Sequence, residues 1–106
     1  MRIQEKFVLR QIMDFLSVRH VFHVRLNTGA FRANYYGNKR FFRCHSLGPG
    51  AADILALPPG KAPVWIETKS NRGRQTEAQK LFASYVETYG HRYVVAHSSD
   101  DLEGFI

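Results

Sequence analysis

Residues 48–69 read GPGAADILALPPGKAPVWIETK, and this stretch decides the fold. Two short apolar runs flank a proline-glycine break, a pattern that predicts two strands joined by a turn. Each run carries charge where a buried strand is usually apolar: Asp53 lies in the first run, and Glu67 and Lys69 lie in the second. Charged side chains are rarely buried without a partner, so these three residues require a physical explanation.

Strand geometry brings the three charges together. Residues two apart in a strand share a face, so Glu67 and Lys69 point to the same side as Trp65. If the two runs pair as a hairpin, Asp53 can lie beside Glu67. Adjacent carboxylates repel one another unless a proton or a cation joins them, and a divalent ion with oxygen ligands, Mg²⁺ or Mn²⁺, is the cation that this pattern favours. Lys69 could then orient a bound water or stabilise charge on a phosphate.

These residues resemble a known signature. Asp53 followed by Glu67-Thr68-Lys69 is similar to the D…(D/E)-x-K motif of the restriction-endonuclease-like nuclease superfamily, and the wider pattern resembles the virus-type replication-repair nuclease (VRR-NUC) family. Four segments follow the order of that family: Glu5 in the first helix, residues 50–53, residues 67–69, and residues 73–79 at the start of a helix. The chain departs from the family at Ala52, where a proline is common.

The resemblance implies a fold, an activity and a partner. It implies a single α/β domain (residues 1–106) with a restriction-endonuclease-like mixed β-sheet flanked by helices. The implied activity is metal-dependent, structure-selective endonucleolytic hydrolysis of DNA phosphodiester bonds. Small stand-alone members resemble Holliday-junction resolvases of phage or bacterial origin, which act as symmetric dimers on two equivalent strands. We therefore expect a homodimer that acts on branched DNA, either a four-way junction or a flap.

The resemblance also implies roles for individual residues. Asp53 and Glu67 would bind Mg²⁺ or Mn²⁺ together with the backbone carbonyl of Thr68, or that of Ile66, and Glu5 is a further candidate ligand. Lys69 would position the attacking water, and Gln79 would support the site. The expected catalytic residues are Asp53, Glu67, Lys69, Gln79 and Glu5. The number of metal ions stays open.

Two of these residues have a second explanation. Glu5 lies on the apolar stripe of a helix predicted from about Ile3 to Ser17, but an acid near a helix N-terminus is also favoured by the helix dipole. Thr76-x-x-Gln79 fits a capping box, in which Gln79 would fold back to the Thr76 amide. The sequence does not separate capping from a role at the site, and both can hold together.

Basic and aromatic residues indicate a nucleic-acid partner. The formal net charge is +6, which favours a polyanion. Residues 30–44 interleave aromatic and cationic side chains around a Gly37-Asn38 turn, which suits stacking on bases and neutralising phosphates, although a hairpin with inward aromatics explains the pattern equally well. Asn27 and Gly29 belong to a turn that the family commonly has, or simply reverse the chain. The expected DNA contacts are Arg72, Arg74, Arg40, Arg43, Lys39, Asn27 and Gly29.

Periodicity predicts the remaining elements. Residues 21–26 alternate, which predicts a strand with Phe22, Val24 and Leu26 facing the core. Residues 92–96 predict a central strand that follows a βαβ crossover, and residues 98–105 a short last helix. Residues 76–89 predict a helix that ends at Gly90. The buried stripe expected of that helix consists of Ala78, Phe82, Tyr85 and Tyr89.

The bulk properties bound the setting and the alternatives. The 106 residues suit one domain, and the lone Cys44 excludes an internal disulfide. The sequence gives no expectation of a leader peptide or of an apolar run of roughly 20 residues that could cross a membrane. We therefore expect an intracellular protein in the cytoplasm of a bacterial host or a phage-infected cell. Two alternatives remain: a non-catalytic nucleic-acid-binding module, and a nuclease subunit of a larger repair or replication complex.

Overall fold

The computed structural model describes residues 4–26, 30–35, 38–43, 50–70 and 72–106, and for residues 30–35 and 38–43 it describes the backbone only. The elements in chain order are α1 (Glu5–Val18), β1 (Phe22–Arg25), β2 (Ala30–Tyr35), β3 (Asn38–Arg43), β4 (Ile54–Leu57), β5 (Val64–Thr68), α2 (Glu77–Thr88), β6 (Arg92–Ala96) and the 3₁₀ helix η1 (Ser99–Leu102). Within these described ranges, no helix has the length and apolar character needed to cross a membrane.

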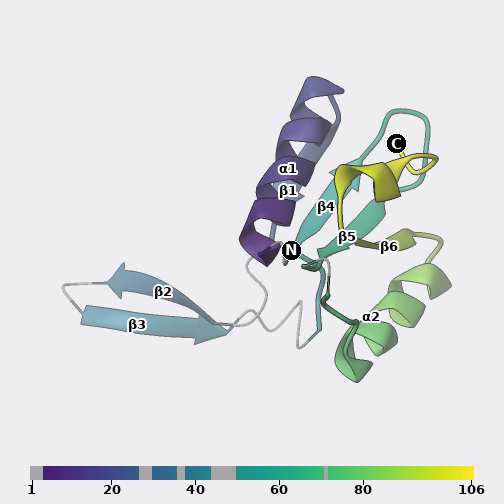
Figure 1. The fold of residues 1–106 in the computed structure, drawn as a ribbon. Coiled ribbons are helices and arrows are strands. Elements are labelled where there is room, and N and C mark those ends of the chain that lie inside the picture. Colours follow the sequence, from purple (N-terminus) through teal and green to yellow (C-terminus); the bar gives the residue numbers. More distant parts are fainter. Residues whose placement is uncertain (1–3, 27–29, 36–37, 44–49, 71) are drawn as a thin grey trace.

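Four strands form a mixed sheet in the order β1-β4-β5-β6. β4 pairs antiparallel with β1 and with β5, so the two charged runs form the predicted hairpin. β6 pairs parallel with β5, which makes β5–α2–β6 the expected βαβ unit. β2 and β3 form a separate antiparallel ribbon (Figure 1). The predicted α/β class, with a mixed sheet flanked by helices, is confirmed.

α1 covers one face of the sheet. Its buried residues Val8, Ile12 and Leu16 recur every four positions, so they form a single stripe along the helix. This stripe packs against alternate residues of the central strands, including the fully buried Ile54 and Ile66. η1 joins the same cluster. The hydrophobic core therefore lies between α1, η1 and this face of the sheet.

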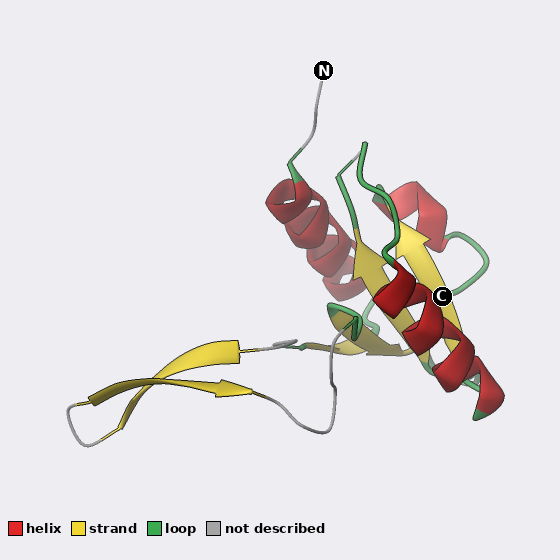
Figure 2. Ribbon diagram, turned by 90° about the horizontal axis from the view of Figure 1, so that it is seen from below, coloured by secondary structure: helices red, strands yellow, loops and turns green. Residues whose placement is uncertain are grey.

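α2 covers the opposite face, over β5 and β6. Trp65 alternates with Ile66 along β5, so its side chain points away from α1. The Trp65 ring meets the Phe82 ring of α2 edge-on, with centroids 5.3 Å apart, and Phe82 also lies 6.3 Å from the ring of Tyr93. The two helices therefore lie on opposite faces of the sheet, as Figure 2 shows from below. The N-terminal ends of both helices lie near the start of β4.

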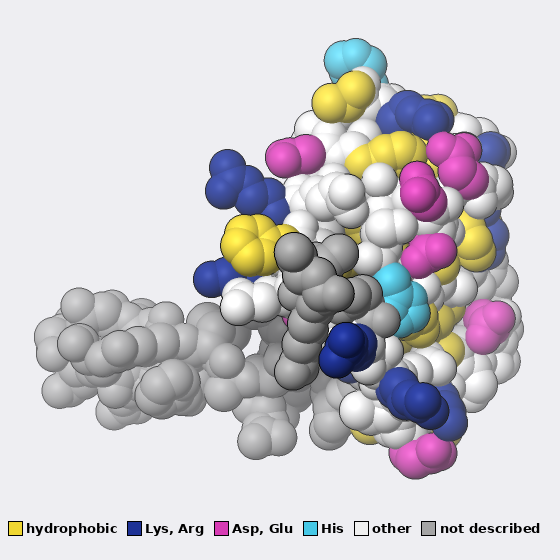
Figure 3. Space-filling model, in the orientation of Figure 1, with side chains coloured by type: hydrophobic (Ala, Val, Ile, Leu, Met, Phe, Trp, Pro, Cys, Tyr) yellow, Lys and Arg dark blue, Asp and Glu magenta, His cyan; other side chains and the backbone are white. Residues whose placement is uncertain are grey.

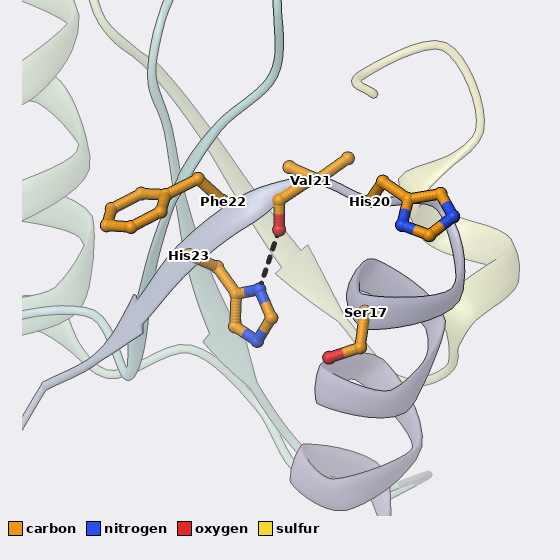
Figure 4. A pocket seen from close by; sticks show the side chains of 5 residues that line it. All are labelled: Ser17, His20, Val21, Phe22 and His23. Carbon is orange, nitrogen blue, oxygen red and sulfur yellow. Dashed lines mark hydrogen bonds between the residues drawn. The ribbon is translucent and has the colours of Figure 1, made fainter.

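Two predictions about which side chains are buried are wrong for β1. Phe22 is 67% exposed and Val24 is 42% exposed, whereas Val21 is buried. Figure 4 shows Phe22 pointing away from α1 and His23 pointing toward the side of Ser17, in an open hollow where His23 Nδ1 donates to the Val21 carbonyl at 2.8 Å. α2 does not reach the face that carries Phe22, so the apolar side of this alternating strand stays open.

Predictions for α2, β6 and the β2–β3 hairpin are also wrong. The α2 stripe is shifted: Ala83 and Val86 are buried, whereas Tyr85 and Tyr89 are 63% and 70% exposed. Ala78, also expected inside, is exposed. β6 lies at one end of the described sheet and is not central, and its apolar run is explained by cover from α2 and from η1. In the hairpin, Asn38 pairs with Tyr35 instead of lying in the turn.

Gly50 brings the loop before Asp53 into contact with the first turn of α2. Its φ is +80°, a conformation that residues with a Cβ rarely adopt. A Cβ built on Gly50 would lie 2.5 Å from the carbonyl carbon and oxygen of Ala78 and 2.8 Å from the backbone nitrogen of Gln79. Glycine at this position therefore allows the loop and the helix to approach so closely.

We expect Gly50→Ala to destabilise the protein more than Gly60→Ala does. Both glycines have positive φ, +80° and +71°, and an alanine in this region costs about 1–2 kcal/mol. A Cβ on Gly60 meets nothing within 4 Å, whereas a Cβ on Gly50 overlaps the backbone of α2, which adds about 1–3 kcal/mol. Urea denaturation measures both losses. Equal losses would show that the loop leaves α2 without a penalty.

Candidate active site

Asp53 and Glu67 lie together at the end of the sheet where β4 begins. The Asp53 amide donates to the Ile66 carbonyl at 3.0 Å, which fixes the residue beside β5. Its carboxylate oxygen Oδ2 accepts two hydrogen bonds from Thr68, one from the amide at 2.9 Å and one from the hydroxyl at 2.8 Å. Glu67 is 2% exposed and points to the α2 side. The structure thus brings together the two acids that the sequence pairs.

Gln79 of α2 makes both of the contacts between which the sequence could not choose. Its side-chain Oε1 accepts from the Thr76 backbone amide at 2.8 Å, and the Gln79 backbone amide donates to the Thr76 hydroxyl at 3.2 Å, which completes a capping box. Its Nε2 donates to Glu67 Oε1 at 2.7 Å. Because the side-chain oxygen is used by the cap, the nitrogen necessarily faces the carboxyl group.

The surroundings of Glu67 strongly favour its protonated form. Burial, hydrogen bonding with the Asp53 carboxyl group and the charge of Asp53 raise the pKa of Glu67 to about 9, and the more distant charge of Glu5 acts in the same direction. Lys69 acts in the opposite direction. Without a cation, Glu67 therefore keeps its proton at neutral pH. A site in which two acids repel in this way is suited to a divalent ion.

Lys69 follows Glu67 by two residues and is half-buried on the same side. Its amide donates to the Ala96 carbonyl at 3.0 Å, which extends the pairing of β5 with β6. Gly73 lies against its side chain, since a Cβ built there would be 3.2 Å from Lys69 Cβ and 3.3 Å from Lys69 Cδ. His97 Nε2 donates to the Gly73 carbonyl at 3.2 Å. The loop after β5 is thus held against the stem of the lysine.

The oxygen donors of the site fit a divalent metal with few protein ligands. In the part of the chain that the structure describes, no group of three or more His, Cys, Asp and Glu side chains is placed to hold a metal. Glu5 is exposed on the first turn of α1 and acts on Glu67 through its charge. A metal site built on Asp53 and Glu67 would therefore take its remaining ligands from backbone oxygen atoms and water. The Ile66 carbonyl already accepts a hydrogen bond from the Asp53 amide. The Thr68 amide donates to the Asp53 carboxylate, and in a strand the carbonyl of a residue points to the same side as its amide. The Thr68 carbonyl is therefore the better placed of the two backbone ligands that the sequence suggested.

Tyr93 is a site residue that the sequence did not reveal. Its hydroxyl is buried and makes no hydrogen bond to another described residue. Burial raises the pKa of Tyr93, Gln75 lowers it, and the nearby charges of Glu67 and Asp53 raise it, so that the net pKa is about 12. Tyr93 pairs with Trp65 across β5 and β6, so it shares the face of Glu67. Only the register of β6 against β5 could have indicated this position.

The expected DNA contacts are only partly described. Arg72 and Arg74 are exposed in the segment between β5 and α2, which follows Lys69 in the chain. Lys39, Arg40 and Arg43 lie in β3, where only the backbone is described. Asn27 and Gly29 lie outside the described residues. Their roles in binding DNA therefore stay predictions.

Comparisons with protein-family models, with curated proteins and with solved structures found no match to this chain. The VRR-NUC resemblance therefore rests on the motif residues. The contacts among Asp53, Glu67 and Gln79 are independent of it, because they follow from the geometry of this chain alone.

We expect Glu67→Gln to change how stability depends on pH. The pKa of Glu67 is about 9 in the folded protein, against an ordinary value of 4.5. Between these values the unfolded chain releases a proton that the folded protein keeps, so the free energy of unfolding falls as the pH rises and levels off above about 9. Glutamine mimics the protonated acid and removes this fall. Urea denaturation in EDTA should show that the free energy of unfolding of the variant rises relative to that of the wild type as the pH increases from 4.5 to about 9.

A metal titration of the same two proteins provides the control. Mg²⁺ binds the ionised carboxylates, so it should raise the melting temperature of the wild type more than that of Glu67→Gln. Parallel pH profiles for the two proteins in EDTA would contradict the raised pKa of Glu67.

Proposed function

We propose that this chain is a metal-dependent endonuclease that hydrolyses phosphodiester bonds in DNA. The observation that carries the proposal is the pairing of Asp53 with the buried Glu67, with Lys69 following on the same strand face and Gln79 hydrogen-bonded to Glu67. Two acids and a lysine at the end of a sheet suit phosphoryl chemistry, because the acids attract a divalent ion and the lysine attracts a phosphate.

Each residue has a defined task in this proposal. Asp53, Glu67 and the Thr68 carbonyl would hold Mg²⁺ or Mn²⁺, which supplies Lewis acidity toward the phosphate and lowers the pKa of a water molecule. Thr68 holds Asp53 in place through its two hydrogen bonds, and Gln79 holds Glu67. The Lys69 ammonium would orient the attacking water and stabilise the negative charge that develops on the phosphate oxygens.

The proposed substrate class comes from the resemblance to the VRR-NUC family. We propose that it is branched DNA, a four-way junction or a flap, cut by a homodimer in the manner of a Holliday-junction resolvase. A two-fold dimer presents two equivalent sites to two equivalent strands. The setting would be the cytoplasm of a bacterial host or of a phage-infected cell. Glu5 would act as a further acid near the metal, and Arg72 and Arg74 would contact phosphates.

A cleavage assay tests the proposed activity. We expect the wild type to nick a four-way junction with Mg²⁺ or Mn²⁺ and not with EDTA. Asp53→Asn should lower cleavage to background because a ligand is lost, and Lys69→Met should lower it by at least about 100-fold because the transition state loses a charge partner. Lys61→Met, an exposed lysine in the β4–β5 turn, is the matched control and should cut like the wild type.

The products separate the alternatives. Paired symmetric nicks would support a dimeric resolvase, and cutting of flaps alone would retain the nuclease and exclude the resolvase. Tight binding of junctions without any cleavage would favour a non-catalytic binding module. Cleavage only after a partner protein is added would favour a subunit of a larger complex.

A pair of variants separates the two contacts of Gln79. Thr76→Ala removes the cap alone, and we expect it to cost about 1 kcal/mol of stability with little loss of cleavage. Gln79→Ala removes the cap side chain and the hydrogen bond to Glu67, so its cleavage rate should fall much further at a similar loss of stability. Urea denaturation and cleavage rates below the melting temperature measure both. Equal cleavage by the two variants would assign Gln79 to the cap only.

A further inference from the structure

A groove between α1 and β1 gathers positive charge at the same end of the sheet as the acids. It encloses about 300 Å³, and its charged lining comprises Lys6 and Arg10 of α1, Arg25 of β1 and one acid, Asp14. Leu9 and Met13 form the rest of the lining. Lys6 and Arg10 are four residues apart, so they project from one side of the helix. Three cations against one acid make this a local excess of positive charge.

The cations of the groove make no ion pair with another described residue. The ammonium group of Lys6 lies 5.4 Å from the centre of the Phe7 ring, and Phe7 is itself 58% exposed. In Figure 3, Lys and Arg side chains project beside an exposed hydrophobic side chain on the side where Figure 1 draws the start of α1. Neighbouring cations that remain without carboxylate partners favour an external anion.

The groove is next to the candidate active site. Arg25 pairs with Ile54, the residue after Asp53, and the Leu26 amide donates to the Asp53 carbonyl at 2.7 Å. Lys6 follows Glu5, whose charge is near enough to Glu67 to raise the pKa of that acid. The groove lies on the α1 side of the sheet, whereas Arg72 follows β5 and precedes α2. A polyanion that runs from one side to the other would cross the two acids.

We propose that Lys6, Arg10 and Arg25 form a binding site for DNA backbone phosphates on the α1 side of the candidate active site. The choice of DNA as the ligand rests on the proposed nuclease function, but the proposal concerns binding and not cleavage. The guanidinium groups of Arg10 and Arg25 take phosphate oxygens in a planar fork, and the ammonium of Lys6 adds a point charge. The strand held here continues past Asp53 and Glu67 toward Arg72 and Arg74.

The salt dependence of DNA binding tests the groove. Each phosphate contact with duplex DNA contributes about 0.9 to the slope of log affinity against log salt. Arg10→Gln/Arg25→Gln should therefore lower the slope by about 1.8, and the affinity at low salt by at least about tenfold. Fluorescence anisotropy of a labelled duplex in EDTA, between about 50 and 200 mM salt, measures the slope without cleavage.

Arg19→Gln/Lys61→Gln is the matched control, because it removes the same net charge. Arg19 follows the C-terminal end of α1, and Lys61 lies in the β4–β5 turn, so both are at the end of the molecule away from Asp53. We expect this pair to change the slope by less than half as much. Equal changes in the two double variants would overturn the proposal and assign binding to net charge. No change in either would overturn it too.

Two further variants protect the test from a folding defect. Arg10→Lys/Arg25→Lys keeps the charge and should keep most of the slope. Lys6→Gln alters one exposed side chain and should lower the slope by about 0.9 even if the double variant does not fold. A lower slope in these variants, together with a wild type that cuts no DNA, would uphold the groove and reject the nuclease. Cleavage with an unchanged slope in Lys6→Gln and Arg10→Gln/Arg25→Gln would do the reverse.

Discussion

The placement of Asp53 against the buried Glu67 is the constraint on which the rest of the site depends. The charge of Asp53 raises the cost of ionising Glu67, and two ionised carboxylates would move apart if they were free to do so. Backbone pairing prevents this separation: Asp53 is bonded to Ile66 and Thr68, and Glu67 is built into β5. The sheet therefore holds a repulsive arrangement that a divalent ion or a proton can relieve.

Both helices are organised around that arrangement. α1 provides the packing that buries Ile54 and Ile66 on one face, which anchors the strands that carry the acids. α2 approaches from the other face, and the absence of a side chain at Gly50 lets its first turn reach the loop before Asp53. The acidic pair and the glutamine thus lie where β5, the first turn of α2 and the loop before Asp53 meet.

The sequence predicted the α/β class, the β4–β5 hairpin, both helices and the meeting of Asp53 with Glu67, because these follow from local periodicity and turn residues. It predicted the wrong face of β1 as the covered one, since alternation is the same whether Phe22 or Val21 faces a helix. It placed β6 in the centre because an apolar run reads the same in any covered strand. Tyr93 was missed because its position depends on pairing across a crossover.

The amide of Gln79 serves two structures with its two ends. Its oxygen completes the start of a helix, and its nitrogen holds a carboxyl group on a neighbouring strand. Glutamate would keep the helix start but place a third acid against the pair, and asparagine is one methylene shorter, so it would have to span both contacts with less reach. Helix formation and the chemistry of the site therefore share one side chain, and this position has little freedom to vary independently of either.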